Sequence, residues 1–249
     1  MVRALLIRRL WLVQNRIFPT ISFLVVLPAL LHICITLVMK NILVRSINEI
    51  PYESWVFPGI IMIISAVSLF PNLYRDLFDL RIHGKALIPM TLAPISKLYL
   101  IAAFLITACL ESLVFVVIGI GILGILSNFP LSVTSYFLIT VYALAFSAIL
   151  GNLMITFSLI TNRIATYLMT ILIMFILILF GSGILVEFEF YSYPIGLILQ
   201  KFPTSMILSS LRALIFYERF DWFGIALPFV ITIAWTWLNA ELFRRKLRQ

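Results

Sequence analysis

Charged residues are scarce in this sequence. Asp, Glu, Lys and Arg make up 11% of its 249 residues, whereas a soluble domain carries about 25%. Hydrophobic residues make up 63%, against about 45 to 50% in a soluble chain. This composition excludes an ordinary soluble domain and predicts a membrane protein.

Residues and motifs that support catalysis or metal binding are also few. The two cysteines, Cys34 and Cys109, both fall in apolar runs, so we expect them to pack as small hydrophobic residues. The sequence has no His-Glu-x-x-His, Gly-x-Ser-x-Gly or Cys-x-x-Cys motif. Its closest approach to a P-loop, Gly84-Lys85-Ala86, lacks the upstream glycine and the hydroxyl that binds magnesium. We therefore expect no catalytic residue, metal site or cofactor in this chain.

Long apolar runs dominate the sequence. A membrane-spanning helix needs about 20 mainly apolar residues, and the runs do not show the polar alternation of barrel strands. Six runs are long enough: Ile21 to Met39, Trp55 to Tyr74, Leu98 to Leu126, Tyr136 to Ile160, Ile164 to Val186 and Trp222 to Leu242. With no repeat or linker, the sequence predicts an all-α membrane protein with one transmembrane domain over residues 1–249.

The positions of the basic residues predict how the chain crosses the membrane. Most of the 18 Lys and Arg residues lie in segments that share a side with the N-terminus, and basic residues are retained in the cytoplasm. We therefore expect a multi-pass protein of the inner (plasma) membrane with both termini cytoplasmic. This topology also accounts for the net charge of +8 without a nucleic-acid partner.

Two segments outside the spans are expected to be amphipathic. In residues 1–18 an apolar stripe lies opposite a polar half that includes Arg8, Arg9 and Arg16, which predicts a helix lying in the membrane interface. The stripe consists of Leu6, Leu10, Val13 and Ile17. The alternative is an ordinary basic flank of the first span. Before the last span, Tyr193 to Leu199 and Ser205 to Phe216 are too short to cross, which predicts a re-entrant helical hairpin or, alternatively, a surface-lying loop.

Glu111 and His32 are ionisable residues inside predicted spans. An ionised carboxylate at mid-span costs about 3 kcal/mol, so Glu111 should face the bundle interior. One interpretation is that the hydroxyls of Thr107 and Ser112 bind it and tie helices together. The other is that Glu111 and His32 serve a membrane-embedded enzyme or a self-sufficient proton-coupled carrier.

A mixed-charge segment from Arg75 to Lys97 separates the second and third runs. A short cytoplasmic helix that docks in a groove of a soluble subunit would need charges for register and apolar residues such as Phe78, Leu80 and Leu87 for contact. Gly84 and the later prolines would redirect the chain into the third span. The alternative is a solvated loop.

Several short motifs occur in an order that is similar to one family. They are Pro58-Gly59, Tyr74-Arg75-Asp76, Leu92-Ala93-Pro94-Ile95-Ser96, Ser182-Gly183, Phe202-Pro203-Thr204 and Leu211-Arg212. Over nearly its whole length the chain resembles the membrane subunit (permease) of ABC transporters of the ABC-2, or type V, exporter class. It departs from the family at Phe202, where Asn is usual, and at Arg81 to Lys85, where relatives often have Glu-x-Gly-Thr.

The resemblance implies a passive transport subunit rather than an enzyme. A second permease copy, or a close relative, and two ABC ATPase subunits that carry ATP and Mg²⁺ would complete the exporter within membrane lipid. The substrate would be amphipathic or lipid-linked: a glycan, a lipid or a drug.

The resemblance also assigns roles to residues. The implied coupling helix to the ATPase, between spans two and three, contains Asp76, Phe78, Asp79, Arg81, His83, Gly84 and Lys85. Candidate residues of the translocation path, for which lipid-facing packing is the alternative, are Phe57, Met62, Phe70, Met169 and Phe175. The outer gate would include Pro203 and Arg212.

Overall fold

The computed structural model describes residues 2–42, 50–82, 95–127 and 131–246. Within these ranges all regular structure is helical, as the sequence predicts. In chain order the elements are α1 (Val2–Gln14), α2 (Ile17–Leu31), η1 (His32–Leu37), α3 (Tyr52–Leu73), η2 (Tyr74–Asp79), α4 (Leu80–Ile82), α6 (Lys97–Leu126), α7 (Val133–Ile160), α8 (Ile164–Gly181), η3 (Phe188–Phe190), α9 (Tyr193–Gln200), α10 (Pro203–Tyr217) and α11 (Trp222–Lys246).

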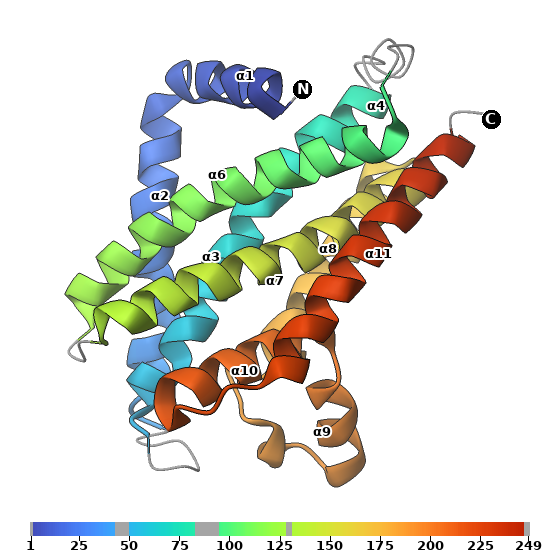
Figure 1. Cartoon of the computed structure of the whole chain (residues 1–249). Helices are drawn as coiled ribbons and strands as arrows, with labels where there is room; N and C mark the ends of the chain where they lie inside the picture. Colours follow the sequence, from blue (N-terminus) through green and yellow to red (C-terminus); the bar gives the residue numbers. More distant parts are fainter. Residues whose placement is uncertain (1, 43–49, 83–94, 128–130, 247–249) are drawn as a thin grey trace.

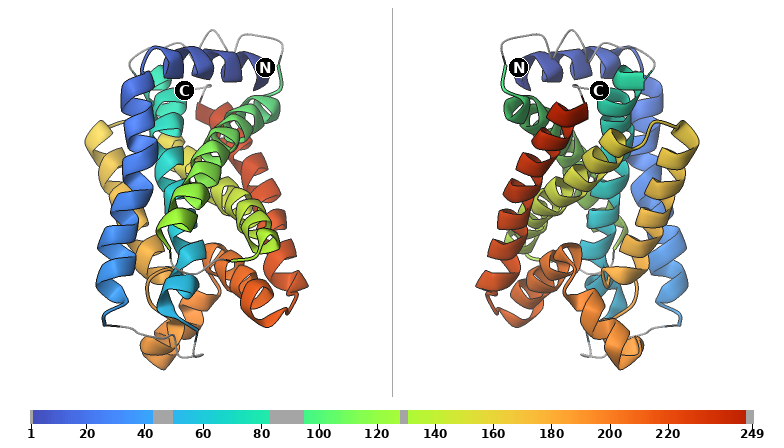
Figure 2. Two further views of the ribbon diagram at one scale, coloured as in Figure 1. Left: turned by 90° about the vertical axis from the view of Figure 1, so that its left-hand side faces the viewer. Right: turned by 90° about the vertical axis from the view of Figure 1, so that its right-hand side faces the viewer.

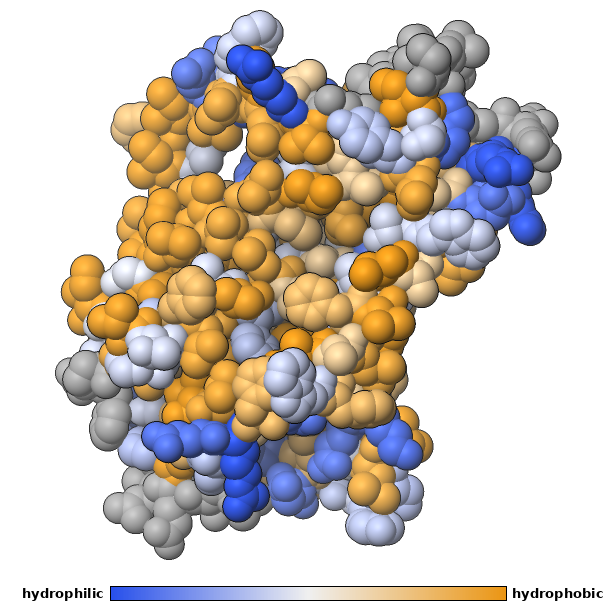
Figure 3. Space-filling view, viewed as in Figure 1, coloured by the Kyte–Doolittle hydropathy of each residue, from blue (hydrophilic) through white to orange (hydrophobic). Residues whose placement is uncertain are grey.

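Six helices in the described ranges are long and apolar enough to cross a membrane, which confirms the predicted multi-pass architecture. They are Ile17–Leu37, Tyr52–Ile82, Lys97–Leu126, Val133–Ile160, Ile164–Gly181 and Trp222–Lys246. The second continues eight residues beyond the predicted end at Tyr74, because η2 and α4 extend α3 without a break. Apolar residues cover the middle of the molecule, and hydrophilic residues gather toward its two ends (Figure 3).

The two ends of the bundle carry different elements. Helix α1 lies across one end, where α4 and the C-terminal end of α11 are also found (Figures 1 and 2). The short helices α9 and α10 lie at the opposite end. The predicted extra segments at the N-terminus and before the last span are therefore both helical, and they lie at opposite ends of the bundle.

Helix α3 is the centre of the bundle. In the most apolar stretch of this span, 83% of the residues are buried. The corresponding share is 17% in the first span and 22% in both α8 and α11. It packs against α2, α6, α7 and α10. The peripheral helices therefore present apolar surface outward, as a lipid environment requires.

Small hydroxyl residues join the three central helices. Ser65 of α3 and Ser147 of α7 have their Oγ atoms 2.7 Å apart, and the Oγ of Ser112 of α6 lies 3.2 Å from that of Ser147. All three residues are buried. Small side chains let helix backbones approach closely, and their hydroxyls hydrogen-bond across the contact.

A second polar contact joins α7 to α11. The Nδ2 of Asn239 donates to the main-chain oxygen of Asn152 over 2.9 Å, and Thr156 Oγ1 donates to Asn239 Oδ1 over 2.7 Å. Trp235 Nε1 and Thr236 Oγ1 add hydrogen bonds to Thr156 and Asn152. This network fixes the position of α11, which is otherwise largely exposed.

We expect Asn239→Leu to lower the free energy of unfolding by about 1 kcal/mol, because it removes hydrogen bonds between helices in an apolar setting. Thermal unfolding of the purified protein in detergent measures this change. Leu238→Ala, at an exposed neighbouring position of α11, is the matched control and should unfold close to wild type. Equal destabilisation by both variants would contradict the assigned role of the network.

Candidate functional site

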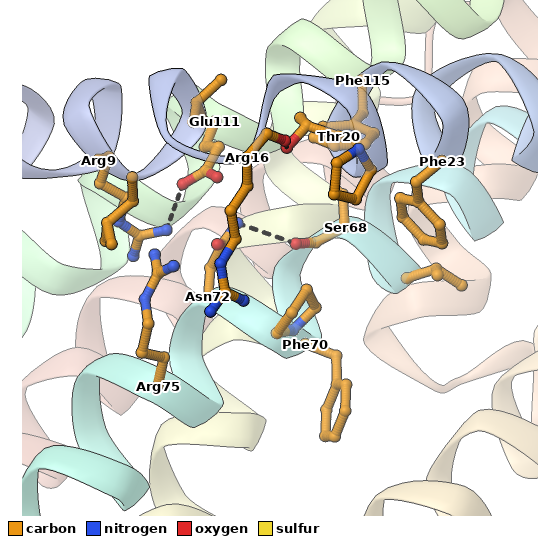
Figure 4. Close-up of a pocket in the computed structure, with 15 residues that line it drawn as sticks. Arg9, Arg16, Thr20, Phe23, Ser68, Phe70, Asn72, Arg75, Glu111 and Phe115 are labelled. Atoms are coloured by element: carbon orange, nitrogen blue, oxygen red, sulfur yellow. Dashed lines mark hydrogen bonds and ion pairs between the residues drawn. The ribbon is translucent and has the colours of Figure 1, made fainter.

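A buried arginine of α1 joins three parts of the chain. Arg9 is 5% exposed and donates from Nη2 to Asp76 Oδ2 over 2.5 Å. Its Nη1 donates to Oε2 of Glu111, in the middle of α6 (Figure 4). Arg9 therefore connects α1, η2 at the end of the second span, and α6.

Two more arginines lie beside the carboxylate of Asp76. Arg8 Nη1 and Arg75 Nε each lie 3.6 Å from Asp76 Oδ1. Asp76 is 1% exposed, so these cations lie beside a carboxylate that is almost fully enclosed by the protein. Removing one partner of such a buried ion pair leaves an uncompensated charge in a medium of low polarity, which is strongly destabilising.

The inward position of Arg9 corrects the predicted orientation of the first helix. The sequence placed Arg9 on the polar half, away from the apolar stripe that contains Leu10. In the structure Leu5 and Arg9 are buried, while Leu10 and Trp11 are 61% and 65% exposed. The reason is tertiary: Asp76 and Glu111, which are distant in sequence, pair with Arg9 and turn this face toward the bundle.

Glu111 has a different partner from those expected. Thr107 Oγ1 donates to the main-chain oxygen of Ala103, and Ser112 Oγ lies near the main-chain oxygen of Ser65 and the Ser147 hydroxyl, so neither hydroxyl binds Glu111. His32 begins η1 and is buried. The charged residues with an electrostatic effect on the His32 imidazole are Glu53 and Lys40, and Glu111 is not one of them.

A cavity of about 520 Å³ lies beneath α1, between the α1–α2 corner and helices α3 and α6. Its polar lining comes from three arginines, one acid and three uncharged residues: Arg9, Arg16, Arg75, Glu111, Thr20, Ser68 and Asn72 (Figure 4). Its apolar lining includes Leu12, Val13, Phe23, Phe70 and Phe115. The molecular surface is hollowed below α1, beside α2 (Figure 3). The site is thus open, cationic on one side and apolar on the other.

The residues expected to contact an ATPase differ in their exposure. Asp76 and Phe78 are buried, and the ring of Phe78 stacks on that of Tyr167 with centroids 4.9 Å apart. These two predicted contact residues are therefore not on the surface in this structure, because the helix continues through them and packs against α8. Asp79 is half-buried, and His83, Gly84 and Lys85 lie outside the described residues.

Arg81 contacts the end of another helix. Its Nη1 donates to the main-chain oxygen of Leu159 over 2.7 Å, and its Nη2 donates to that of Thr161. These carbonyls belong to the last turn and C-cap of α7, which a cation stabilises. The segment that leads into residues 83–94 is therefore held by α7.

The predicted path residues are dispersed. Phe57 and Met62 are 5% and 0% exposed within the α3 contacts, whereas Met169 on α8 is 63% exposed. Phe175 is partly buried on the same helix, and Phe70 lines the cavity beneath α1. The structure does not bring these five residues together around one cavity.

The two predicted gate residues lie at different places. Arg212 donates to the main-chain oxygens of Trp55, Gly183 and Ile184 and lies 3.5 Å from the centroid of the Trp55 ring. Arg212 is buried, so these carbonyls and the indole ring surround its guanidinium group. Pro203 instead begins α10 and lines an apolar cavity of about 280 Å³.

Arg9 and Arg16 line the site but are not among the residues that the sequence predicted for it. One signal was present: an acid within a span needs a cationic partner, and the arginines before the first span supply one for Glu111. No family model matches the sequence, and no curated protein matches it.

We expect Arg9→Met to lower the free energy of unfolding by about 3 to 5 kcal/mol, because it leaves Asp76 buried without its closest cation. Chemical unfolding in detergent measures the effect, and Arg3→Gln, an exposed arginine of the same helix, is the control. The triple variant Arg9→Met, Asp76→Asn, Glu111→Gln should recover much of the loss, since it removes the charges together. A triple variant less stable than Arg9→Met alone would contradict the ion-pair argument.

Proposed function

We propose that this chain is the transmembrane permease subunit of an ATP-driven exporter of the ABC-2 type. Two copies, or this chain and a relative, would pair with two separate ATPase subunits that bind ATP and Mg²⁺. The substrate would be an amphipathic or lipid-linked molecule, and both termini would lie in the cytoplasm. The ion-pair cluster around Arg9 is the observation that carries this proposal.

The cluster supports a mechanical role for the segment between the second and third spans. Asp76 lies six residues before Ile82, the last residue of the second span, and it is bonded to α1 through Arg9. Arg9 in turn is bonded to Glu111 of α6, the helix that follows the segment. A displacement of residues 83–94 by an ATPase would therefore act on α1, α3 and α6 together, as coupling through contiguous packed elements requires.

The backbone at this point is irregular. Residues Tyr74–Asp79 form a π-helical segment between α3 and α4. Such segments inside α-helices are frequent at functional sites. The long second span would change its helical pitch at this irregular segment when residues 83–94 are displaced.

A groove at the same end supports the docking of a subunit. A cavity of about 400 Å³ is lined by the start of α6 and the last turns of α11, including Ser96, Lys97, Trp237, Glu241 and Arg244. Two of its lining residues, Ser96 and Lys97, come shortly after residues 83–94 in the chain. Its mixture of both charge signs with an exposed tryptophan suits a contact with a soluble protein.

The opposite end supports a re-entrant hairpin. At about 1.5 Å per residue, α9 and α10 are about 12 and 22 Å long, short of the about 30 Å hydrocarbon core. Both lie at the end of the bundle where α8 ends and α11 begins (Figure 1). We propose that they enter the outer leaflet and return, while α1 lies in the cytoplasmic interface with Leu10 and Trp11 toward lipid.

Variants at Lys85 and Arg81 distinguish an effect on ATPase docking from an effect on the stability of the chain. We expect Lys85→Glu to weaken ATPase binding, more strongly at low salt than at high salt, because rim charges steer association. Arg81→Glu should in addition lower the thermal stability of the chain alone, since it replaces the cation at the end of α7. Binding is measured by titrating purified ATPase onto the chain in nanodiscs, with Arg219→Glu at the opposite end of the bundle as control.

Reconstitution tests the exporter proposal directly. The chain alone in proteoliposomes should move no amphipathic substrate, and transport should need the ATPase subunit with MgATP. Substrate movement by the chain alone would argue against an ATPase-driven permease. Full coupling to ATP hydrolysis in Lys85→Glu would instead argue against the assignment of the docking segment between spans two and three.

A further inference from the structure

Two guanidinium groups in the cavity beneath α1 have no hydrogen-bond partner in the described part of the chain. Arg16 is exposed at the corner between α1 and α2, and its main chain alone is hydrogen-bonded. Arg75 Nε is buried without a hydrogen bond, and Asp76 Oδ1 is 3.6 Å away. Figure 4 shows both side chains extending toward the region of Asn72.

The acids near the cavity do not balance its arginines. Asp76 and Glu111 both form their short contacts with Arg9. The cations in and beside the cavity are Arg8, Arg9, Arg16 and Arg75, so four positive charges face two negative ones and an excess of two remains. A cavity with this excess attracts an anion.

The uncharged lining adds further donors and an apolar wall. Asn72 Nδ2 donates to the main-chain oxygen of Ser68 over 3.0 Å and keeps a second N–H, because an amide nitrogen carries two. On the other side, the rings of Phe23 and Phe115 meet edge to face at 5.9 Å. The volume of about 520 Å³ lies within the roughly 300 to 1,000 Å³ of small-molecule sites.

The surroundings of the cavity are suited to an acyl chain. Helix α2 begins beside it with Ile17, Phe18 and Ile21, which are 49%, 87% and 56% exposed. An ion from water would meet only the arginines, whereas an amphiphile would use both the cationic side and this apolar surface.

We propose that this cavity binds the phosphate group of an anionic membrane lipid. The forks of Arg16 and Arg75 match the oxygens of a phosphate, and the side chain of Asn72 adds a neutral donor. The acyl chains lie along Phe23, Phe115 and the start of α2. Binding of this kind requires neither ATP nor a partner subunit, so it stands apart from the exporter proposal.

Titration of the purified chain in neutral detergent tests the site. Native mass spectrometry would follow binding of short-chain phosphatidic acid, phosphatidylcholine with the same chains, and inorganic phosphate. Saturable binding of phosphatidic acid is expected. The double variant Arg16→Gln, Arg75→Gln should weaken it about tenfold or more, since hydrogen bonds to charged groups are lost.

The matched control is Arg3→Gln, Arg163→Gln, which removes the same charge from two exposed arginines and should keep wild-type affinity. An equal loss in this control, or equal affinity for phosphatidylcholine, would overturn the proposal, and so would inorganic phosphate binding as tightly as phosphatidic acid.

The conservative variant Arg16→Lys, Arg75→Lys guards against misfolding, because it keeps the charge. It should bind with intermediate affinity and unfold near the wild-type temperature, since lysine keeps a positive charge beside Asp76. Wild-type affinity in the Gln and the Lys double variants of Arg16 and Arg75 would also overturn the proposal.

Discussion

The pairing of Arg9 with Asp76 and Glu111 is the interaction on which the arrangement of one end of the bundle depends. A carboxylate that is 1% exposed in an apolar bundle is tolerated only with a cation in contact. That cation comes from α1, which also packs against the core through Leu5. The orientation of α1 against η2 and α6 therefore depends on this contact.

The opposite end of the bundle is held by another buried arginine with different partners. Arg212 of α10 donates to three main-chain oxygens and covers the Trp55 ring. It thereby ties α10 to the start of α3 and to the turn after α8. Arg9 meets carboxylates and Arg212 meets carbonyls, but in both cases a cation that lipid would not accept is used inside the protein to join segments.

Between these ends, neutral polar groups connect the helices. The serines of α3, α6 and α7 and the asparagines of α7 and α11 are buried and hydrogen-bonded to one another. Lipid tails are as apolar as the side chains, so apolar contact between helices gains little over contact with lipid. Hydrogen-bonded contacts therefore specify which helix faces meet. The charged cluster, in contrast, lies beside a cavity that Arg16 and Arg75 also line.

The sequence by itself determined the class of the protein, its spans and its short helices. Hydropathy identified all six spans, and the two short apolar stretches before the last span match α9 and α10 closely, because a bilayer imposes a length that can be counted along the chain. Only the tertiary structure decided where the side chains of those segments point. Arg9 turned inward, Phe78 became buried against Tyr167, and Arg16 and Arg75 came to share a cavity. Local periodicity does not predict such pairings, since each depends on a charge or ring brought near by the packing of residues distant in sequence.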